Sequence, residues 1–203
     1  MIIWLITFLL YIKYVNRLFS KEKAETANIF LSTMHAYYTT LVSFLYLMNI
    51  SIIVPYYTEI IFLSTYFAAH DIYIQHKYKF KGRVSLTIHH LLIIFGLYLL
   101  LNYYNNDVPK ITLVAYNYLT EISTPFLNKS IMLYNQKMQH HINYKISSVI
   151  LLLTFFCVRV IGGLYFIYLA SFQPFILLCA QISLTSLNYI WFYKLILMMR
   201  KNS

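Results

Sequence analysis

Long apolar runs separated by short polar connections dominate this chain. A helix needs about 20 mostly apolar residues to cross a bilayer, and seven runs come close to that length. They cover residues 2–19, 29–48, 56–76, 84–103, 111–133, 146–168 and 174–198. The apolar residues are continuous within each run rather than alternating, which is typical of membrane helices and not of barrel strands. The pattern therefore predicts an all-α, polytopic membrane bundle of about seven transmembrane helices.

The first run is the least regular, because Lys13 and Arg17 interrupt it. No basic segment precedes it and no small-residue cleavage site follows it, so we interpret it as an uncleaved anchor rather than a signal peptide. The chain is then divided into two parts. Residues 1–28 form an N-terminal transmembrane anchor with a basic loop, and residues 29–203 form a six-helix membrane domain with a short tail.

Composition and charge agree with a membrane protein. Hydrophobic residues make up 60% of the chain and charged residues 11%, whereas a soluble domain carries roughly 25% charged residues. The net charge is +10, but the basic residues cluster between apolar runs, which favours anionic lipid headgroups as partners over nucleic acid. Cys157 and Cys179 lie inside apolar runs without metal-ligand spacing, so we predict neither a metal site nor a disulfide.

The basic residues also predict an orientation. They lie in the odd-numbered connections and the tail, at Arg17, Lys21, Lys23, Lys77, Lys79, Lys81, Arg83, Lys137, Lys145, Arg200 and Lys201. The even-numbered connections contain only Lys110. The positive-inside rule then predicts a lumenal N-terminus and a cytosolic C-terminus. The glycosylation sequon that begins at Asn49 would lie on the lumenal side.

Polar side chains persist inside six of the runs, although each ionisable group costs roughly 2.5–3.5 kcal/mol to insert. They are His35, His70, Asp71, His89, His90, Glu121, Asn128, Arg159 and Asn188. With a helix rise of 1.5 Å per residue, a first group lies about 7–9 Å from the cytosolic end, namely His35, Asp71, His89, His90 and Asn128. The second group, Glu121, Arg159 and Asn188, lies about 15–20 Å from that end. Two such layers facing inward predict a polar cavity that opens to the cytosol.

Most of these residues have a functional and a structural interpretation. His89 and His90 point about 100° apart on a helix, so only one of them can face the cavity centre. That histidine would act as a general base or nucleophile oriented by Asp71, or the pair would simply bond neighbouring helices. Glu121 and Arg159 would form an intramembrane ion pair, or Arg159 would hold an anionic group of a ligand.

The fifth run contains a further signal between its two polar residues. Pro125 lies between Glu121 and Asn128 and removes a backbone donor, which is common where a membrane helix lines a cavity. We therefore expect an interrupted helix at this point. Asn128 lies two turns after Glu121 and shares its face, whereas Asn188 either bonds a neighbouring helix or contacts a ligand.

The ordered set of these motifs resembles the TLC domain family, whose members include ceramide synthases, translocon-associated proteins and lipid-regulating proteins of the endoplasmic reticulum. The motifs are Ser32-Thr33-Met34-His35, Tyr66-Phe67 with Asp71, His89-His90, the stretch from Glu121 to Asn128, and Phe155-Phe156 with Arg159. The likeness covers about residues 30–198. It implies a six-helix bundle around a lipid-accepting cavity, often preceded by one further helix.

The resemblance also implies chemistry. Ceramide synthases carry a paired histidine, like His89-His90 here, and acylate a sphingoid amine from acyl-CoA. This chain departs from their longer motif at Leu119-Thr120-Glu121, which is followed by Ser-Thr-Pro-Phe. In that respect it looks like the branch of the family that is not made up of synthases, whose members are tied to membrane lipid composition.

From the resemblance we expect a multi-pass protein of the endoplasmic reticulum that acts in lipid homeostasis and binds a sphingoid base, ceramide or phospholipid. If it is an enzyme, it transfers an acyl group from acyl-CoA to a lipid amine without a bound cofactor. The catalytic residues would be His89, His90 and Asp71, and the substrate-binding residues His35, Glu121, Asn128, Arg159 and Asn188. The alternatives are a non-enzymatic sensor or regulator of lipid composition, and a transporter, for which inverted repeats would be expected and none is found.

Overall fold

The structure is a computed structural model that describes residues 21–49, 57–80, 82–103 and 108–202. Within these ranges every regular element is helical and no strand occurs. The elements are α2 (Lys21–Leu47), α3 (Tyr57–Lys77), α4 (Arg83–Tyr103), α5 (Val108–Leu119), a 3₁₀ turn (Thr120–Ser123), α6 (Thr124–Asn135), α7 (Ile142–Phe155), a π-helical turn (Phe156–Ile161), α8 (Gly162–Ala170) and α9 (Phe175–Asn202). The expected span at 2–19 and the sequon serine, Ser51, lie outside the described residues.

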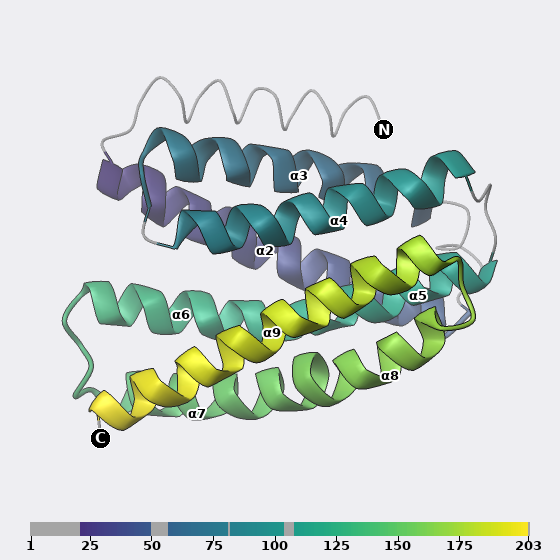
Figure 1. Cartoon of the computed structure of the whole chain (residues 1–203). Helices are drawn as coiled ribbons and strands as arrows, with labels where there is room; N and C mark the ends of the chain where they lie inside the picture. The colour runs from purple at the N-terminus through teal and green to yellow at the C-terminus, as the bar shows by residue number, and fades with distance from the viewer. Residues whose placement is uncertain (1–20, 50–56, 81, 104–107, 203) are drawn as a thin grey trace.

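The described helices form six rods that coincide with six of the seven predicted runs. The 3₁₀ turn joins α5 to α6, and the π-helical turn joins α7 to α8, so each pair makes one interrupted rod. Figure 1 shows the end of α3, the start of α4 and the α6–α7 connection at one end of the bundle, and the end of α4, the start of α5 and the α8–α9 connection at the other. Successive rods therefore run in opposite directions, as expected for helices that cross a membrane in turn.

Helix α9 crosses the bundle diagonally and joins its two halves (Figure 1). It packs against α4 on one side and against α7, α8 and the π-helical turn on the other. Helix α2 packs against α3, α5 and α6. These two crossing helices bring α4, the 3₁₀ turn and the π-helical turn around one interior region, which is where most of the polar side chains lie.

The distribution of side chains is that of a protein in lipid. Phe175 is 78% exposed and Leu153 59%, whereas Asp71 and Arg159 are each 4% exposed. Two described helical segments, Ile142–Ala170 and Phe175–Arg200, are long and apolar enough to cross a membrane, and Arg83–Leu99 is a shorter apolar helix. The all-helical membrane architecture is thus supported, but the count of seven spans is not confirmed.

Both interrupted rods have a local cause. Pro125 lies in the first turn of α6, and the N–H of Thr124 donates to the Glu121 carbonyl in the shorter 3₁₀ pattern. The expected interruption at Pro125 is therefore confirmed. After the π-helical turn, Gly163 lets α8 approach α9, because a Cβ at this position would lie 2.8 Å from Thr185 Cγ2.

Candidate functional site

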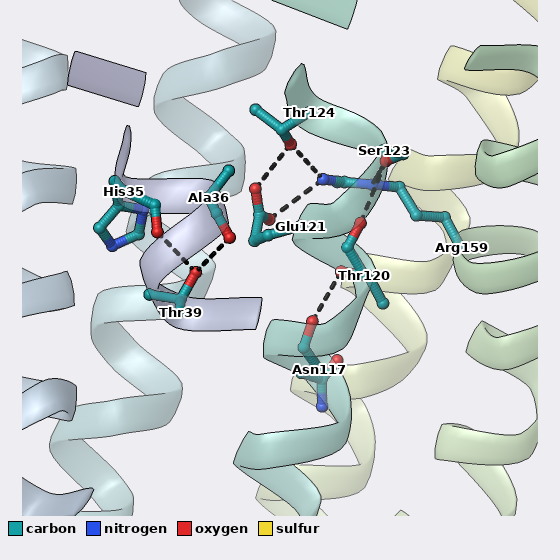
Figure 2. A network of polar contacts seen from close by, with 9 residues as sticks. All are labelled: His35, Ala36, Thr39, Asn117, Thr120, Glu121, Ser123, Thr124 and Arg159. Carbon is teal, nitrogen blue, oxygen red and sulfur yellow. Dashed lines mark hydrogen bonds and ion pairs between the residues drawn. The ribbon is translucent and has the colours of Figure 1, made fainter. Parts of the chain in front are cut away.

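The two interrupted rods face each other, and an ion pair joins them. Arg159 from the π-helical turn donates from Nη2 to Glu121 Oε1 in the 3₁₀ turn at 3.0 Å. Figure 2 shows Glu121 between α2 and Arg159. Mid-helix 3₁₀ and π turns often mark functional sites because they release backbone groups and redirect side chains. The predicted intramembrane ion pair is confirmed.

Hydroxyl groups complete the environment of this pair. Arg159 Nε donates to Ser123 Oγ at 2.9 Å, and Nη2 also donates to Thr124 Oγ1 at 3.0 Å. Thr124 in turn donates to the second carboxylate oxygen of Glu121 at 2.7 Å (Figure 2). Among the described residues, no group accepts a hydrogen bond from Arg159 Nη1. The guanidinium therefore joins the two turns through Nε and Nη2.

A second polar cluster lies beside α3. His90 Nε2 and Asp71 Oδ2 are 2.7 Å apart, and both side chains are buried. Asn28 of α2 donates to the other oxygen of Asp71 at 2.7 Å. Gln75, one turn further along α3, also donates to the carboxylate. Asp71 is thus bonded on both oxygens and holds His90 in one orientation, as a triad carboxylate holds its imidazole.

His89 points the other way, into an interior cavity. Its Nδ1 is buried without a hydrogen-bond partner among the described residues. Its ring lies 5.0 Å from the ring of Trp191 and 5.4 Å from that of His90, measured between centroids. The structure therefore separates the histidine pair: His90 is bonded to Asp71, and His89 presents its imidazole to the cavity.

The cavity has a polar end and an apolar end. Its polar lining comes from side chains on α4, α5, the two irregular turns and α9, namely His89, Asn117, Thr120, Glu121, Arg159, Gln181 and Asn188. Its apolar lining includes Ile93, Leu97, Leu113, Phe166 and Leu177, together with Gly96. The volume is about 100 Å³, and one water needs roughly 10–15 Å³ on this measure. A polar headgroup or a short length of acyl chain fits this space.

The cavity lies along the middle of α4 and the first half of α9. Beside it, Trp191 packs on His89 and donates to Ser85 Oγ at 2.5 Å. This indole therefore borders the cavity on the side of the first turn of α4. The opening of the cavity to the cytosol stays a prediction.

Two predicted ligand-binding residues do not line the cavity. His35 stacks on Phe67, with ring centroids 4.0 Å apart, and its Nε2 lies 3.1 Å from Ser64 Oγ. Asn128 donates to Thr33 Oγ1 at 2.9 Å and thereby bonds α6 to α2. These contacts satisfy the polar groups between helices, so the structure places His35 and Asn128 in helix packing. The cavity itself brings together His89, Glu121, Arg159 and Asn188.

Sequence reasoning missed several residues that the structure places at the site. Asn117 donates to Gln181 at 3.0 Å across the cavity, and Trp191 covers His89. Helical spacing carried a usable signal, because Asn117 lies four residues before Glu121, and Gln181 lies seven residues before Asn188. Trp191 follows Asn188 by three residues and thus lies on a neighbouring part of the same face.

The arrangement is suited to acid–base chemistry on an amphiphile. An imidazole faces the cavity, a carboxylate-bound imidazole lies behind it, and a guanidinium borders the same space. In the part of the chain that the structure describes, no group of three histidine, cysteine or acidic side chains could hold a metal ion.

Comparison with known proteins identifies the family. The family model of the TLC domain matches residues 1–197, which include every polar residue of the site. No curated protein and no solved structure matches the chain. The resemblance drawn from the motifs is thus confirmed over almost the whole sequence. The chain belongs to the TLC domain family and is an integral membrane protein of lipid metabolism or lipid sensing.

Proposed function

We propose that this protein binds a membrane lipid in the interior cavity and transfers an acyl group from acyl-CoA to an amine of that lipid. The observation that carries the proposal is the position of His89. It faces a cavity that is polar around Glu121 and Arg159 and apolar at its other end, while its neighbour His90 is bonded to Asp71. An amphiphile with an amine headgroup matches the polar and apolar ends of this cavity.

The cavity offers a place for each part of such a lipid. The amine and hydroxyl groups of the headgroup would meet His89, the unbonded Nη1 of Arg159 and Asn188, whose Oδ1 is buried without a described partner. Only the first part of the acyl chain would fit in the cavity of about 100 Å³, toward Leu113 and Leu177. Unsatisfied buried polar atoms at a cavity wall favour a ligand that supplies the missing hydrogen bonds.

The transfer would proceed by general base catalysis. The lipid amine attacks the thioester carbonyl of acyl-CoA, and His89 removes a proton from the attacking nitrogen. The carbon–sulfur bond then breaks, and the coenzyme A thiolate leaves and takes the proton from His89. The products are the amide and free coenzyme A. His90, bonded to Asp71, would keep its imidazole in a fixed orientation beside His89.

Product formation by the purified protein tests the enzymatic proposal. The reconstituted full chain is given palmitoyl-CoA and a panel of sphingoid bases and other lipid amines, and the amide is measured by mass spectrometry. His89→Ala should lower kcat/KM by about 10²-fold or more, since a positioned base contributes about 10²–10⁴-fold. His76→Ala is the matched control, because His76 is exposed and bonds only Thr87. Product formation that survives His89→Ala unchanged excludes this mechanism.

The cavity's role in lipid binding has its own test. Gly96 lines the apolar part, and a Cβ there would meet no atom within 4 Å. Gly96→Leu should therefore fill space without disturbing the helices. We expect the lipid that co-purifies with this variant to be at least several-fold reduced or to have shorter chains, with thermal stability unchanged. An unaltered lipid profile would show that the cavity does not hold the chain.

A non-enzymatic role as a lipid sensor is the second candidate, and the bonding of the site favours it. Asp71 is already bonded by three side chains, and Trp191 covers His89 on the side from which a soluble donor would approach. A lipid held in a closed cavity would then alter how α9 packs. Failure to form product with any acceptor, together with a retained lipid, would support this function over acyl transfer.

The cellular setting belongs to the same proposal. We place the protein in the endoplasmic reticulum with seven spans, a lumenal N-terminus and a cytosolic C-terminus. Its likeness to the part of the family that is not made up of synthases belongs with the sensor function rather than with acyl transfer. The alternation of basic connections supports the orientation. Attachment of a modifiable tag to each terminus, followed by protease protection in microsomes, tests it, and protection of both tags or of neither would contradict an odd number of spans.

A further inference from the structure

A second hollow lies on the outside of the bundle, between the start of α4 and the last part of α9. Its lining residues are Lys79, Phe80, Gly82, Arg83, Val84, Ser85, Ile88, Leu187, Ile190 and Lys194, and we call it the α4–α9 groove. The volume is about 690 Å³, which lies within the range of about 300–1,000 Å³ that is usual for ligand sites. The hollow is shallow and open to the outside, so this volume includes space beyond the protein surface, and part of a lipid can lie against it.

The groove has cations at its rim and apolar side chains below them. Lys79, Arg83 and Lys194 supply the charge, and its lining contains no acidic residue. Among the described residues, none of these three cations is held in an ion pair. Ile88 and Ile190 are 48% and 51% exposed and lie beside the same groove. Along α4, Ile88 is five residues past Arg83, so the apolar part begins about 7.5 Å deeper.

The turn before α4 helps to build this rim. Lys79 and Gly82 both adopt left-handed backbone conformations, with φ of 53° and 82°. The chain reverses direction there, and the Arg83 N–H bonds back to the Phe80 carbonyl at 3.4 Å. Both Lys79 and Phe80 thus border the groove together with the first turn of α4. The paired cations and the aromatic ring are those expected at a membrane surface.

We propose that the α4–α9 groove is a binding site for an anionic phospholipid of the adjacent leaflet. The phosphate would lie among Lys79, Arg83 and Lys194, and one acyl chain would run along Ile88 and Ile190. Charge complementarity decides the class of lipid, because three cations without an acidic partner among the described residues favour a headgroup with net negative charge over a zwitterionic one. The site is separate from the interior cavity and does not depend on acyl transfer.

Ser85 and Trp191 lie between the groove and the interior cavity. Ser85 lines the groove and accepts the bond from Trp191, whose ring packs on His89 at the wall of the cavity. A lipid bound in the groove would therefore alter the hydrogen bond between Ser85 and Trp191 and the position of the Trp191 ring. The tryptophan lies between a lipid held at the surface and the histidine that faces the interior.

Native mass spectrometry of the full chain in detergent tests the proposal by titration with phosphatidylglycerol and phosphatidylcholine of identical chains. We expect phosphatidylglycerol to bind at least about tenfold more tightly. The triple variant Lys79→Gln/Arg83→Gln/Lys194→Gln should lose about 10- to 100-fold of that affinity. The matched control is Lys129→Gln/Lys137→Gln/Lys145→Gln, which removes three exposed cations that do not line the groove and should keep the preference.

Several results would overturn the proposal. Equal losses in the two triple variants would indicate general attraction to basic loops. Full competition by glycerol 3-phosphate would indicate a site for free phosphate, and stronger binding of palmitoyl-CoA would indicate a site for the coenzyme. If the triple variant does not fold, salt titration of the unmodified chain decides, because binding of a phosphate by the exposed Lys79 and Lys194 and the half-buried Arg83 must weaken as salt is added. A preference that does not change with salt would exclude the site.

Discussion

Removing one charge of the Glu121–Arg159 ion pair should greatly destabilise the protein, because the other charge stays buried without a partner. Glu121→Gln keeps the size of the side chain and an acceptor oxygen but removes the negative charge. The Arg159 side chain is only 5% exposed and that of Glu121 17%, so the remaining positive charge cannot be solvated well. Removal of one partner from a buried pair typically costs about 3–5 kcal/mol, and we expect the free energy of unfolding to fall by about that amount.

A control and a double variant separate the effect of the buried charge from other effects of substitution. Glu25→Gln removes a carboxylate that bonds Asn135 on the surface at 3.0 Å, and it should cost less than about 0.5 kcal/mol. The double variant Glu121→Gln/Arg159→Met removes the buried charge altogether. It should be less destabilised than Glu121→Gln alone, because replacement of both ions by groups of similar volume is often neutral.

The free energy of unfolding would be measured by reversible titration with SDS in mixed micelles, with helix content as the signal. Arg159→Met alone completes a double-mutant cycle with the unmodified chain, Glu121→Gln and the double variant, and Glu25→Gln is a control outside the cycle. If Glu121→Gln costs no more than Glu25→Gln, the ion pair does not hold the two irregular turns together. If the double variant is worse than the sum of its parts, the cost lies in lost packing rather than in an uncompensated charge.

Two further substitutions test contacts around α9. Gly163→Ala should lower the free energy of unfolding by about 1–3 kcal/mol in the same titration, because the new Cβ would lie 2.8 Å from Thr185 Cγ2. In the control Gly162→Ala, the nearest atom to the new Cβ is 3.4 Å away, and the substitution should be tolerated. Equal effects of the two substitutions would contradict close packing of α8 on α9. Trp191→Ala should speed exchange of a fluorescent lipid bound in the cavity by several-fold, because it removes the cover over the cavity and the bond to Ser85. Trp191→Phe keeps the ring and should exchange within about twofold of the unmodified chain, and equal rates for both variants would show that Trp191 does not restrict access.

The helices themselves were predictable from local pattern. The runs expected at 56–76 and 84–103 correspond to α3 and α4 within one residue at each end. The run at 111–133 became an interrupted rod, and Pro125 predicted the interruption because a missing N–H is a local property of the chain. The π-helical turn carrying Arg159 had no comparable signal, since it depends on the contact of that rod with α9 and the 3₁₀ turn.

The site was predicted in part, and its failures have a common cause. Equal depth along two helices correctly predicted that Glu121 and Arg159 would meet. Depth says nothing about the direction in which a side chain points around its helix. For that reason His35 and Asn128, placed at the right height, turned out to bond neighbouring helices instead of lining the cavity. The same ambiguity applies to Trp191, because its position in the run 174–198 does not show that its ring packs on His89.

By itself, the sequence determined that this chain is a helical membrane protein with costly polar groups inside it, because hydrophobic run length and the cost of burying charge are local quantities. The tertiary structure decided which polar groups share a space and which of them bond neighbouring helices instead. Its decisive contacts join residues far apart in the chain, such as Asn28 with Asp71 across 43 positions and Ser85 with Trp191 across 106. Such contacts depend on how whole helices cross, and crossing is set by the packing of many side chains at once.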